Sequence, residues 1–166
     1  MKTALRTSAL ALSLAVAALE LAGCSAADEA VSNVTGGGGS SFDGVYTTVL
    51  SKNCNGCHGA SAPGYNPGET ESTLDFSSAD KAYTSLLGKA AGLTGNNAAC
   101  NDVAFVVPGD AAKSLLMASI DRATRTAFVS GGCNKDSVSA MESRGGTLTA
   151  AQVEGVRAWI NGGAKR

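Results

Sequence analysis

The spacing of apolar residues predicts a helix that starts just after position 41. Ser41 is a favourable N-cap residue, and the apolar residues after it recur at the i, i+3, i+4, i+7 and i+8 positions of one helical face. That face consists of Phe42, Val45, Tyr46, Val49 and Leu50. We expect this helix to bury its apolar face against the rest of the folded chain.

A second amphipathic helix is predicted near the end of the chain. Thr149 and Gln152 have the spacing of a capping box, in which each side chain bonds to the backbone N–H of the other residue. One apolar face follows, formed by Val153, Val156, Trp159 and Ile160. The Asn-Gly-Gly run at residues 161–163 predicts the end of this helix.

Two weaker helical patterns lie between these segments. Residues 78–87 begin with a serine suited to an N-cap, carry apolar residues at helical spacing and precede Gly88. Residues 111–120 follow a Val-Val-Pro-Gly-Asp run and are also expected to be helical. With 21 glycines and 3 prolines among 166 residues, much of the remainder is expected to be flexible loop. The prediction is a mostly α fold with few long helices and long Gly-rich loops.

The chain has about the length of one domain, and its charges are nearly balanced. The sequence has 13 Lys and Arg residues against 14 Asp and Glu residues, and no block of like charge occurs. A protein that binds nucleic acid needs a basic excess to neutralise phosphates. Nucleic acid is therefore not expected as a partner.

The start of the chain has the pattern of an export signal. Lys2 and Arg6 give it a positive end, and residues 9–19 form an apolar run shorter than the roughly 20 residues that span a bilayer. The Leu-Ala-Gly-Cys run at residues 21–24 resembles the lipobox of bacterial lipoproteins. This resemblance implies cleavage before Cys24 and acylation of that residue.

Three regions follow from this pattern. Residues 1–23 are expected to be a lipoprotein signal peptide, and residues 24–41 a flexible tether with acylated Cys24, because they are rich in Gly, Ser and Ala. Residues 42–166 are the expected globular domain. The alternative is an ordinary secreted protein that is cleaved near residues 26–27, so that Cys24 is lost with the signal.

The only histidine of the chain belongs to its most specific motif. Cys54, Cys57 and His58 form a C-x-x-C-H pattern, in which two thiols form thioethers with the haem vinyl groups and the imidazole ligates iron. A zinc site would need two further ligands at comparable spacing, and a thioredoxin-type C-x-x-C does not need the adjacent histidine. The export signal fits this interpretation, because bacterial haem attachment takes place in the periplasm.

With this motif in place, nearly all of residues 42–164 resembles the small soluble c-type cytochromes. The resemblance rests on the helix before the motif, on a VPGD and SLL stretch at residues 107–116, and on an LT, Q, V, WI and GA ending at residues 148–164. It implies a cytochrome c-like fold of a few short helices around one covalently bound haem, with the two terminal helices crossing beside the haem edge. Aromatic residues expected in the core or the haem pocket are Tyr65, Phe76, Tyr83 and Phe105.

The resemblance also implies a methionine as the second axial ligand of the iron. Met141 lies in a loop before the last helix, where the family places this ligand, although Glu142 follows it where relatives commonly have proline. The alternative is Met117, which lies on an apolar helical face and is more typical of core packing. In the family a proline after the motif accepts a hydrogen bond from the ligating imidazole, which makes Pro63 the candidate partner of His58.

The five cysteines can then all be assigned. Cys24 carries the lipid and two cysteines hold haem, which leaves Cys100 and Cys133 in an oxidising compartment. We predict that these two form a disulfide, with two free thiols as the alternative.

The sequence thus predicts an electron carrier and not an enzyme, with no catalytic residue of its own. It is expected in the bacterial cell envelope, lipid-anchored to a membrane on the periplasmic or surface side, with the outer membrane favoured. There it would pass single electrons between redox protein partners. The alternatives are a haem-based gas or redox sensor and the haem subunit of an oxidoreductase, both of which require a labile sixth ligand. A haem peroxidase is disfavoured because no second histidine is present as an acid or base.

Overall fold

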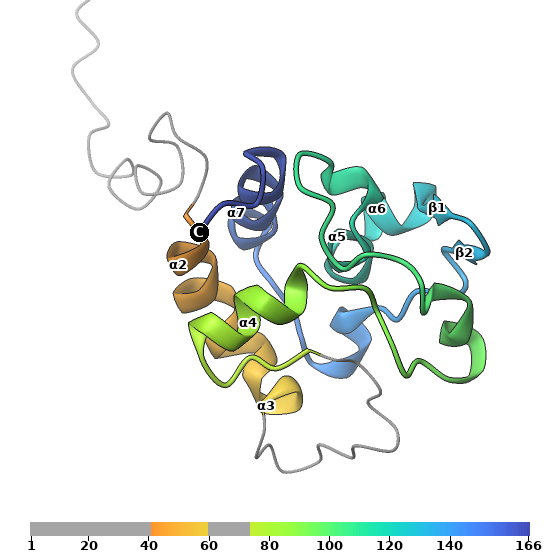
Figure 1. Cartoon of the computed structure of the whole chain (residues 1–166), viewed down its shortest axis with the longest axis horizontal. Coiled ribbons are helices and arrows are strands. Elements are labelled where there is room, and N and C mark those ends of the chain that lie inside the picture. Colours follow the sequence, from red (N-terminus) through yellow and green to blue (C-terminus); the bar gives the residue numbers. More distant parts are fainter. Residues whose placement is uncertain (1–40, 60–73) are drawn as a thin grey trace, which may run out of the picture.

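The computed structural model describes residues 41–59 and 74–166 (Figure 1). The predictions for the signal peptide, the tether with Cys24, Pro63 and Tyr65 lie outside these residues. The elements in chain order are α2 (Phe42–Val45), η1 (Tyr46–Cys54), α3 (Asn55–His58), α4 (Ala79–Leu86), η2 (Gly95–Cys100), η3 (Ala111–Lys113), α5 (Leu115–Ile120), α6 (Arg122–Ala127), β1 (Val129–Ser130), β2 (Cys133–Asn134), η4 (Met141–Arg144) and α7 (Ala150–Asn161). The predicted mostly α class is confirmed.

The first helical segment starts where the sequence predicts. Ser41 caps α2, since its hydroxyl oxygen accepts a hydrogen bond from the N–H of Gly44 at 3.2 Å. The continuation, η1, winds as a π-helix, so the N–H of Asn55 bonds to the carbonyl of Leu50. Side chains here compete for backbone carbonyls, as when the hydroxyl of Thr48 donates to the carbonyl of Gly44 at 2.7 Å. Apolar spacing alone did not predict this wider turn.

The last helix, α7, packs beside the first (Figure 1). The predicted capping box between Thr149 and Gln152 is present in both directions. The amide nitrogen of Gln152 also donates to the carbonyl of Thr48 at 2.8 Å, which fixes the start of α7 on η1. The helical segment formed by α2 and η1 therefore packs against α7, and it leads directly into α3.

The central helices agree only in part with the prediction. Ser78 caps α4 as expected, accepting a hydrogen bond from the N–H of Lys81. The single helix expected over residues 111–120 is wrong, because the chain is extended at Ser114 and separates η3 from α5. The buried Ser114 hydroxyl accepts from the N–H of Val107 at 2.9 Å and donates to the carbonyl of Asp110 at 2.8 Å. These two bonds hold the break in place.

A disulfide and a short hairpin organise the remaining part. Strands β1 and β2 pair antiparallel, with Ser130 opposite Cys133. Cys133 is bonded to Cys100, with Cα atoms 4.7 Å apart, and both residues are buried. This is the pair expected from the cysteine count. The bond ties η2 to β2 and so anchors the chain that leads on to η4.

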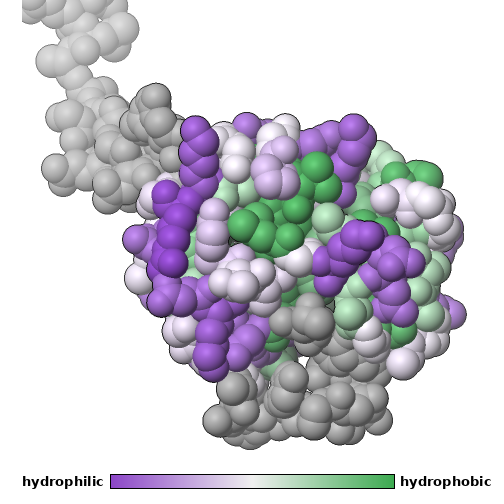
Figure 2. Space-filling view, in the orientation of Figure 1, coloured by the Kyte–Doolittle hydropathy of each residue, from purple (hydrophilic) through white to green (hydrophobic). Residues whose placement is uncertain are grey.

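The core lies between the terminal helices and α5. Its largest fully buried side chains are Trp159, Phe42, Phe76, Leu50, Leu86, Met117 and Ile160. In Figure 2, hydrophilic residues cover much of the visible face and surround a hydrophobic area near its centre. In the described part of the chain, no helix has the length and apolar character needed to cross a bilayer.

Candidate functional site

The three residues of the C-x-x-C-H motif lie where η1 passes into α3. Cys54 ends η1, and Cys57 and His58 lie on the single turn of α3. Cys54 is half-buried and Cys57 is exposed, and both thiols are free. The two thiols and the imidazole therefore lie on adjoining turns, at the end of η1 and in α3.

His58 lies against an aromatic side chain of the core. Its ring centroid is 5.3 Å from that of Phe76, and the N–H of Phe76 donates to the carbonyl of His58 at 2.8 Å. The hydroxyl of Tyr46 donates to the carbonyl of Phe76 at 3.3 Å, which ties this pair back to η1. Burial lowers the pKa of His58, so the neutral imidazole that ligates metals is favoured.

The Cys54 thiol has a shifted acidity. Burial, with a smaller contribution from neighbouring Cys57, raises the pKa of Cys54 to about 11. Cys54 is therefore a protonated thiol at neutral pH. A redox-active dithiol of the thioredoxin type depends on a lowered thiol pKa. The raised pKa that burial gives Cys54 is opposite to what that alternative needs.

The C-terminal end of α3 is closely packed. Gly59 is buried, and a Cβ atom at this position would lie 2.6 Å from the carbonyl oxygen of Asn55. Within the described part of the chain, Asn55 Oδ1 is the one buried side-chain oxygen or nitrogen that has no hydrogen-bond partner. Buried polar atoms in folded proteins are normally satisfied. The Asn55 side-chain oxygen is an exception to this rule.

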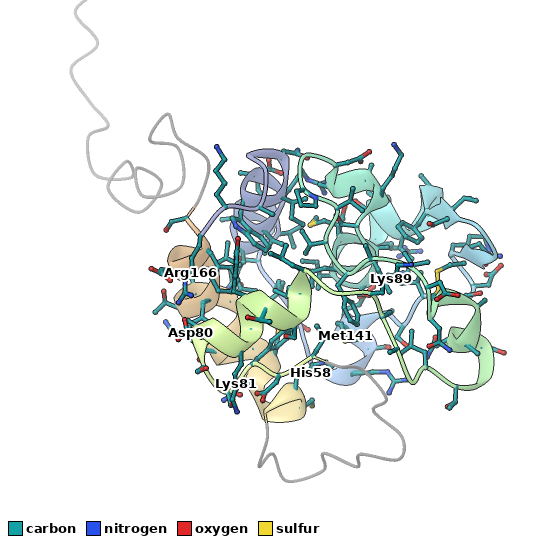
Figure 3. All side chains as sticks on the ribbon, in the orientation of Figure 1. His58, Asp80, Lys81, Lys89, Met141 and Arg166 are labelled. Carbon is teal, nitrogen blue, oxygen red and sulfur yellow. A yellow bond between two sulfur atoms is a disulfide. The ribbon has the colours of Figure 1, made fainter. Side chains whose placement is uncertain are left out.

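The two methionines of the domain have different surroundings. Met117 is fully buried in α5, among the side chains of the core. Met141 begins η4 and is half-buried. His58 and Met141, both labelled in Figure 3, come from different elements, α3 and η4. Of the two thioethers, the one of Met141 is the more accessible to a ligand.

The segment around Met141 is a short helix, whereas the sequence predicts a loop. The N–H of Gly146 donates to the carbonyl of Met141 at 2.9 Å, and Gly145 adopts a left-handed conformation with φ of 89°. Glycine adopts this conformation at no steric cost, so it can close the turn directly after η4.

Two arginine pairs beside this segment carried no signal in the sequence. Arg125 on α6 forms an ion pair with Glu142 on η4, and hydrogen bonds from Arg125 lower the pKa of that carboxyl. Arg157 on α7 pairs with Asp121 at 2.7 Å. Asp121 is a residue type suited to an N-cap, and its carboxylate accepts from the N–H groups of Ala123 and Thr124, but neither arginine stands at a spacing that indicates its partner.

The donor groups on η1, α3 and η4 are two free thiols, an imidazole whose pKa is lowered by burial, and a thioether. These are the groups that attach a haem through thioethers and ligate its iron, with the porphyrin nitrogens filling the other positions. No group of three His, Cys, Asp or Glu residues suited to a bare metal ion occurs in residues 41–59 and 74–166. Two thiols, an imidazole and a thioether are donor types that fit a covalently attached haem.

Comparison with known proteins adds nothing to the description of these residues. The chain has no match among protein-family models, curated proteins or solved structures.

Proposed function

We propose that the protein is a single-haem c-type cytochrome that carries electrons. Cys54 and Cys57 would hold the haem covalently, and His58 and Met141 would ligate its iron within a cytochrome c-like fold. One observation carries the proposal: the two motif thiols are free beside His58, whereas Cys100 and Cys133 are joined to each other. Bonding between Cys100 and Cys133 leaves the motif available for the cofactor.

The attachment needs no further reactant. Each thiol of Cys54 and Cys57 would add across one vinyl group, with sulfur bonding to one carbon and the hydrogen passing to the other. The bound haem would supply an iron that takes up and releases one electron. His58 would give a nitrogen lone pair to the iron, and the neighbouring Phe76 ring would exclude water from that side.

The placement of the methionines supports Met141 as the second ligand. Met117 is held in the core, and its withdrawal would leave a cavity. Met141 needs no such rearrangement, because it lies at the start of a short surface helix. A thioether ligand favours ferrous iron and raises the reduction potential. A closed six-coordinate iron suits electron transfer. The interfaces formed with redox protein partners would be short-lived, because such interfaces are usually small and weak.

The cell envelope is the proposed location. Export by residues 1–23 and acylation at Cys24 would anchor the protein to a membrane, with the outer membrane favoured. A tether of residues 24–41 would reach on the order of 20–25 Å, which lets the domain approach partners near the membrane surface.

Haem attachment is the first test. The full chain is expressed in a bacterium with c-type maturation proteins, and haem that survives denaturation and solvent extraction is measured, together with protein mass. We expect one covalent haem in the parent and none in the Cys54→Ala/Cys57→Ala double variant. Lys52→Ala, next to the motif, serves as the matched control and keeps its haem. An exported, reduced parent without covalent haem would overturn the proposal.

Carbon monoxide binding tests the coordination. The ferrous parent is expected to show no spectral shift with carbon monoxide, whereas Met141→Ala shows a clear one and Met117→Ala behaves as the parent. Ready binding by the parent would mean a labile sixth ligand. The function would then be that of a gas or redox sensor or of an oxidoreductase subunit.

A further inference from the structure

The guanidinium of Arg125 connects two elements that are separate in sequence. Its Nη1 donates to the carbonyls of Ala118 at 3.1 Å and Ser119 at 3.3 Å, and to Oε2 of Glu142 at 3.2 Å. Its Nη2 pairs with Oε1 of the same carboxylate. Only 12% of the Arg125 side chain is exposed. The group therefore bridges the end of α5 and the first turn of η4.

The α5 side of this bridge holds the guanidinium in one orientation. The last carbonyls of a helix have no partner within the helix, and a cation near this end also interacts favourably with the helix dipole. Arg125 supplies both the hydrogen-bond donor and the positive charge to the end of α5, whose residues Leu115–Ala118 are buried. A planar guanidinium with two nitrogens on one carboxylate also fixes the direction of that carboxylate. Glu142 is thus held relative to the core.

Met141 is the residue directly before Glu142 and shares its turn. The carbonyl of Met141 accepts from the N–H of Gly146, and the next two residues after Glu142 are exposed. No buried residue lies within η4 to hold it on the core. The bridge from Arg125 consequently joins the start of η4, and Met141 with it, to the end of α5, while Asn97 holds Ser139 just before η4 at 2.8 Å.

We propose that Arg125 and Glu142 are positioning residues that hold the Met141 thioether in place for the iron. The inference rests on the proposed function and adds to it the means by which the sixth ligand is kept bound. Without the bridge, η4 would move on the surface, and the Met141 sulfur would spend more time away from the iron.

The test uses the haem-loaded full chain. Glu142→Ala removes the carboxylate, Glu142→Gln keeps its shape without the charge, and Arg125→Lys keeps the charge without the planar fork. Lys113→Ala, which removes an exposed ion pair with Asp110 elsewhere, is the matched control. The readouts are the apparent carbon monoxide affinity of the ferrous protein and the ferric absorption band of the iron–thioether bond. Amide hydrogen exchange at Gly146 reports on the turn itself.

We expect Glu142→Ala and Arg125→Lys to raise the apparent carbon monoxide affinity by about fivefold to tenfold, because the open state becomes more populated. The iron–thioether band weakens in step, exchange at Gly146 is faster, and Glu142→Gln lies between Glu142→Ala and the parent. Lys113→Ala matches the parent. Since a purely structural role would change only the unfolding midpoint, the spectral readouts decide.

Two results would separate this inference from the proposed function. A parent with methionine ligation that Glu142→Ala leaves unchanged in affinity, band and exchange overturns the positioning role alone. A parent without covalent haem, or one in which Met141→Ala changes nothing, overturns the ligand assignment and this inference with it.

Discussion

The indole ring of Trp159 packs against the phenyl ring of Phe42, with centroids 5.2 Å apart and planes inclined by 49°. Both side chains are almost completely buried. They join α7 to α2, the last and first helices of the described residues, so this contact forms only when distant parts of the chain have come together. The indole nitrogen also donates to the carbonyl of Lys165 at 2.7 Å.

Replacement of Trp159 is therefore expected to be among the most damaging single changes in the core. Trp159→Ala should lower the free energy of unfolding by about 3–5 kcal/mol, because it leaves a large cavity between the terminal helices. Urea denaturation followed by far-UV circular dichroism measures the change. Val129→Ala, at a side chain that is 73% exposed, is the control and should change stability by less than about 0.5 kcal/mol. Equal effects of the two changes would contradict the packing described.

The disulfide can be checked by chemistry alone. When the haem-free protein is unfolded without reductant, a maleimide should label Cys54 and Cys57 but neither Cys100 nor Cys133. Mass spectrometry of the peptides identifies the labelled residues. The bridged pair is separated by 33 residues, so the Cys100→Ala/Cys133→Ala variant should lose about 3–4 kcal/mol of stability. Labelling at either bridged position would refute the pairing.

Acid should weaken the link between α6 and α7. Burial opposes the charge of Asp121, but hydrogen bonds from Thr124 and Arg157 outweigh it and lower its pKa from 3.8 to about 2. Because the folded pKa is the lower one, this contribution to stability is complete above about pH 4 and is lost as the pH falls toward 2.

The variant Asp121→Asn tests this directly. It should cost about 1–2 kcal/mol at pH 7, a value reduced for partial solvent screening, and nearly nothing at pH 2. Glu154 is the exposed partner of the same arginine, and Glu154→Gln should cost less than about 0.5 kcal/mol at pH 7. A penalty for Asp121→Asn that stays constant from pH 7 to pH 2 would show that its charge is not the source.

Local patterns in the sequence account for the terminal helices. Ser41 and the capping box of Thr149 and Gln152 act within one turn, and the apolar faces beside them repeat at helical spacing. The break at Ser114 could not be predicted, since it depends on contacts with Val107 and Asp110 in a preceding loop. Helix α6 was missed because none of its residues is buried and no apolar pattern marks it.

The candidate site divides in the same way. Cys54, Cys57 and His58 are adjacent in sequence, so their spacing alone indicates their chemistry. Arg125 and Glu142 lie 17 positions apart in sequence with a hairpin between them, and nothing in either local sequence specifies the partner. Such a contact is set by packing of α5, α6 and η4, which only the folded structure contains.

The two methionines should respond differently to truncation. Met117→Ala removes a fully buried side chain and should cost the haem-free protein about 2–5 kcal/mol. Met141→Ala removes a half-buried side chain and should cost the same protein less than about 1 kcal/mol. Chemical denaturation of both variants measures the difference. A larger loss at Met141 would mean that this residue is a packing residue, which would count against its role as a ligand.

Two glycines of the C-x-x-C-H region offer the most local test of the site. At Gly59 a Cβ atom would meet the carbonyl of Asn55 at 2.6 Å, whereas at Gly56 a Cβ atom would meet nothing within 4 Å. Neither has a positive φ, so neither position requires glycine for its backbone conformation. Gly59→Ala must therefore push the turn of α3 aside, while Gly56→Ala fits into it.

We expect Gly59→Ala to destabilise the haem-free protein by about 1–3 kcal/mol, the usual cost of overpacking. Gly56→Ala should be neutral or slightly stabilising, because alanine is the better helix former. If the junction of η1 and α3 presents the two motif thiols to a haem, Gly59→Ala should also lower the yield of covalent haem, and Gly56→Ala should not. Equal haem yields in the two variants, with the stability difference intact, would mean that haem attachment tolerates a displaced α3 turn. Attachment would then not depend on the close packing at Gly59.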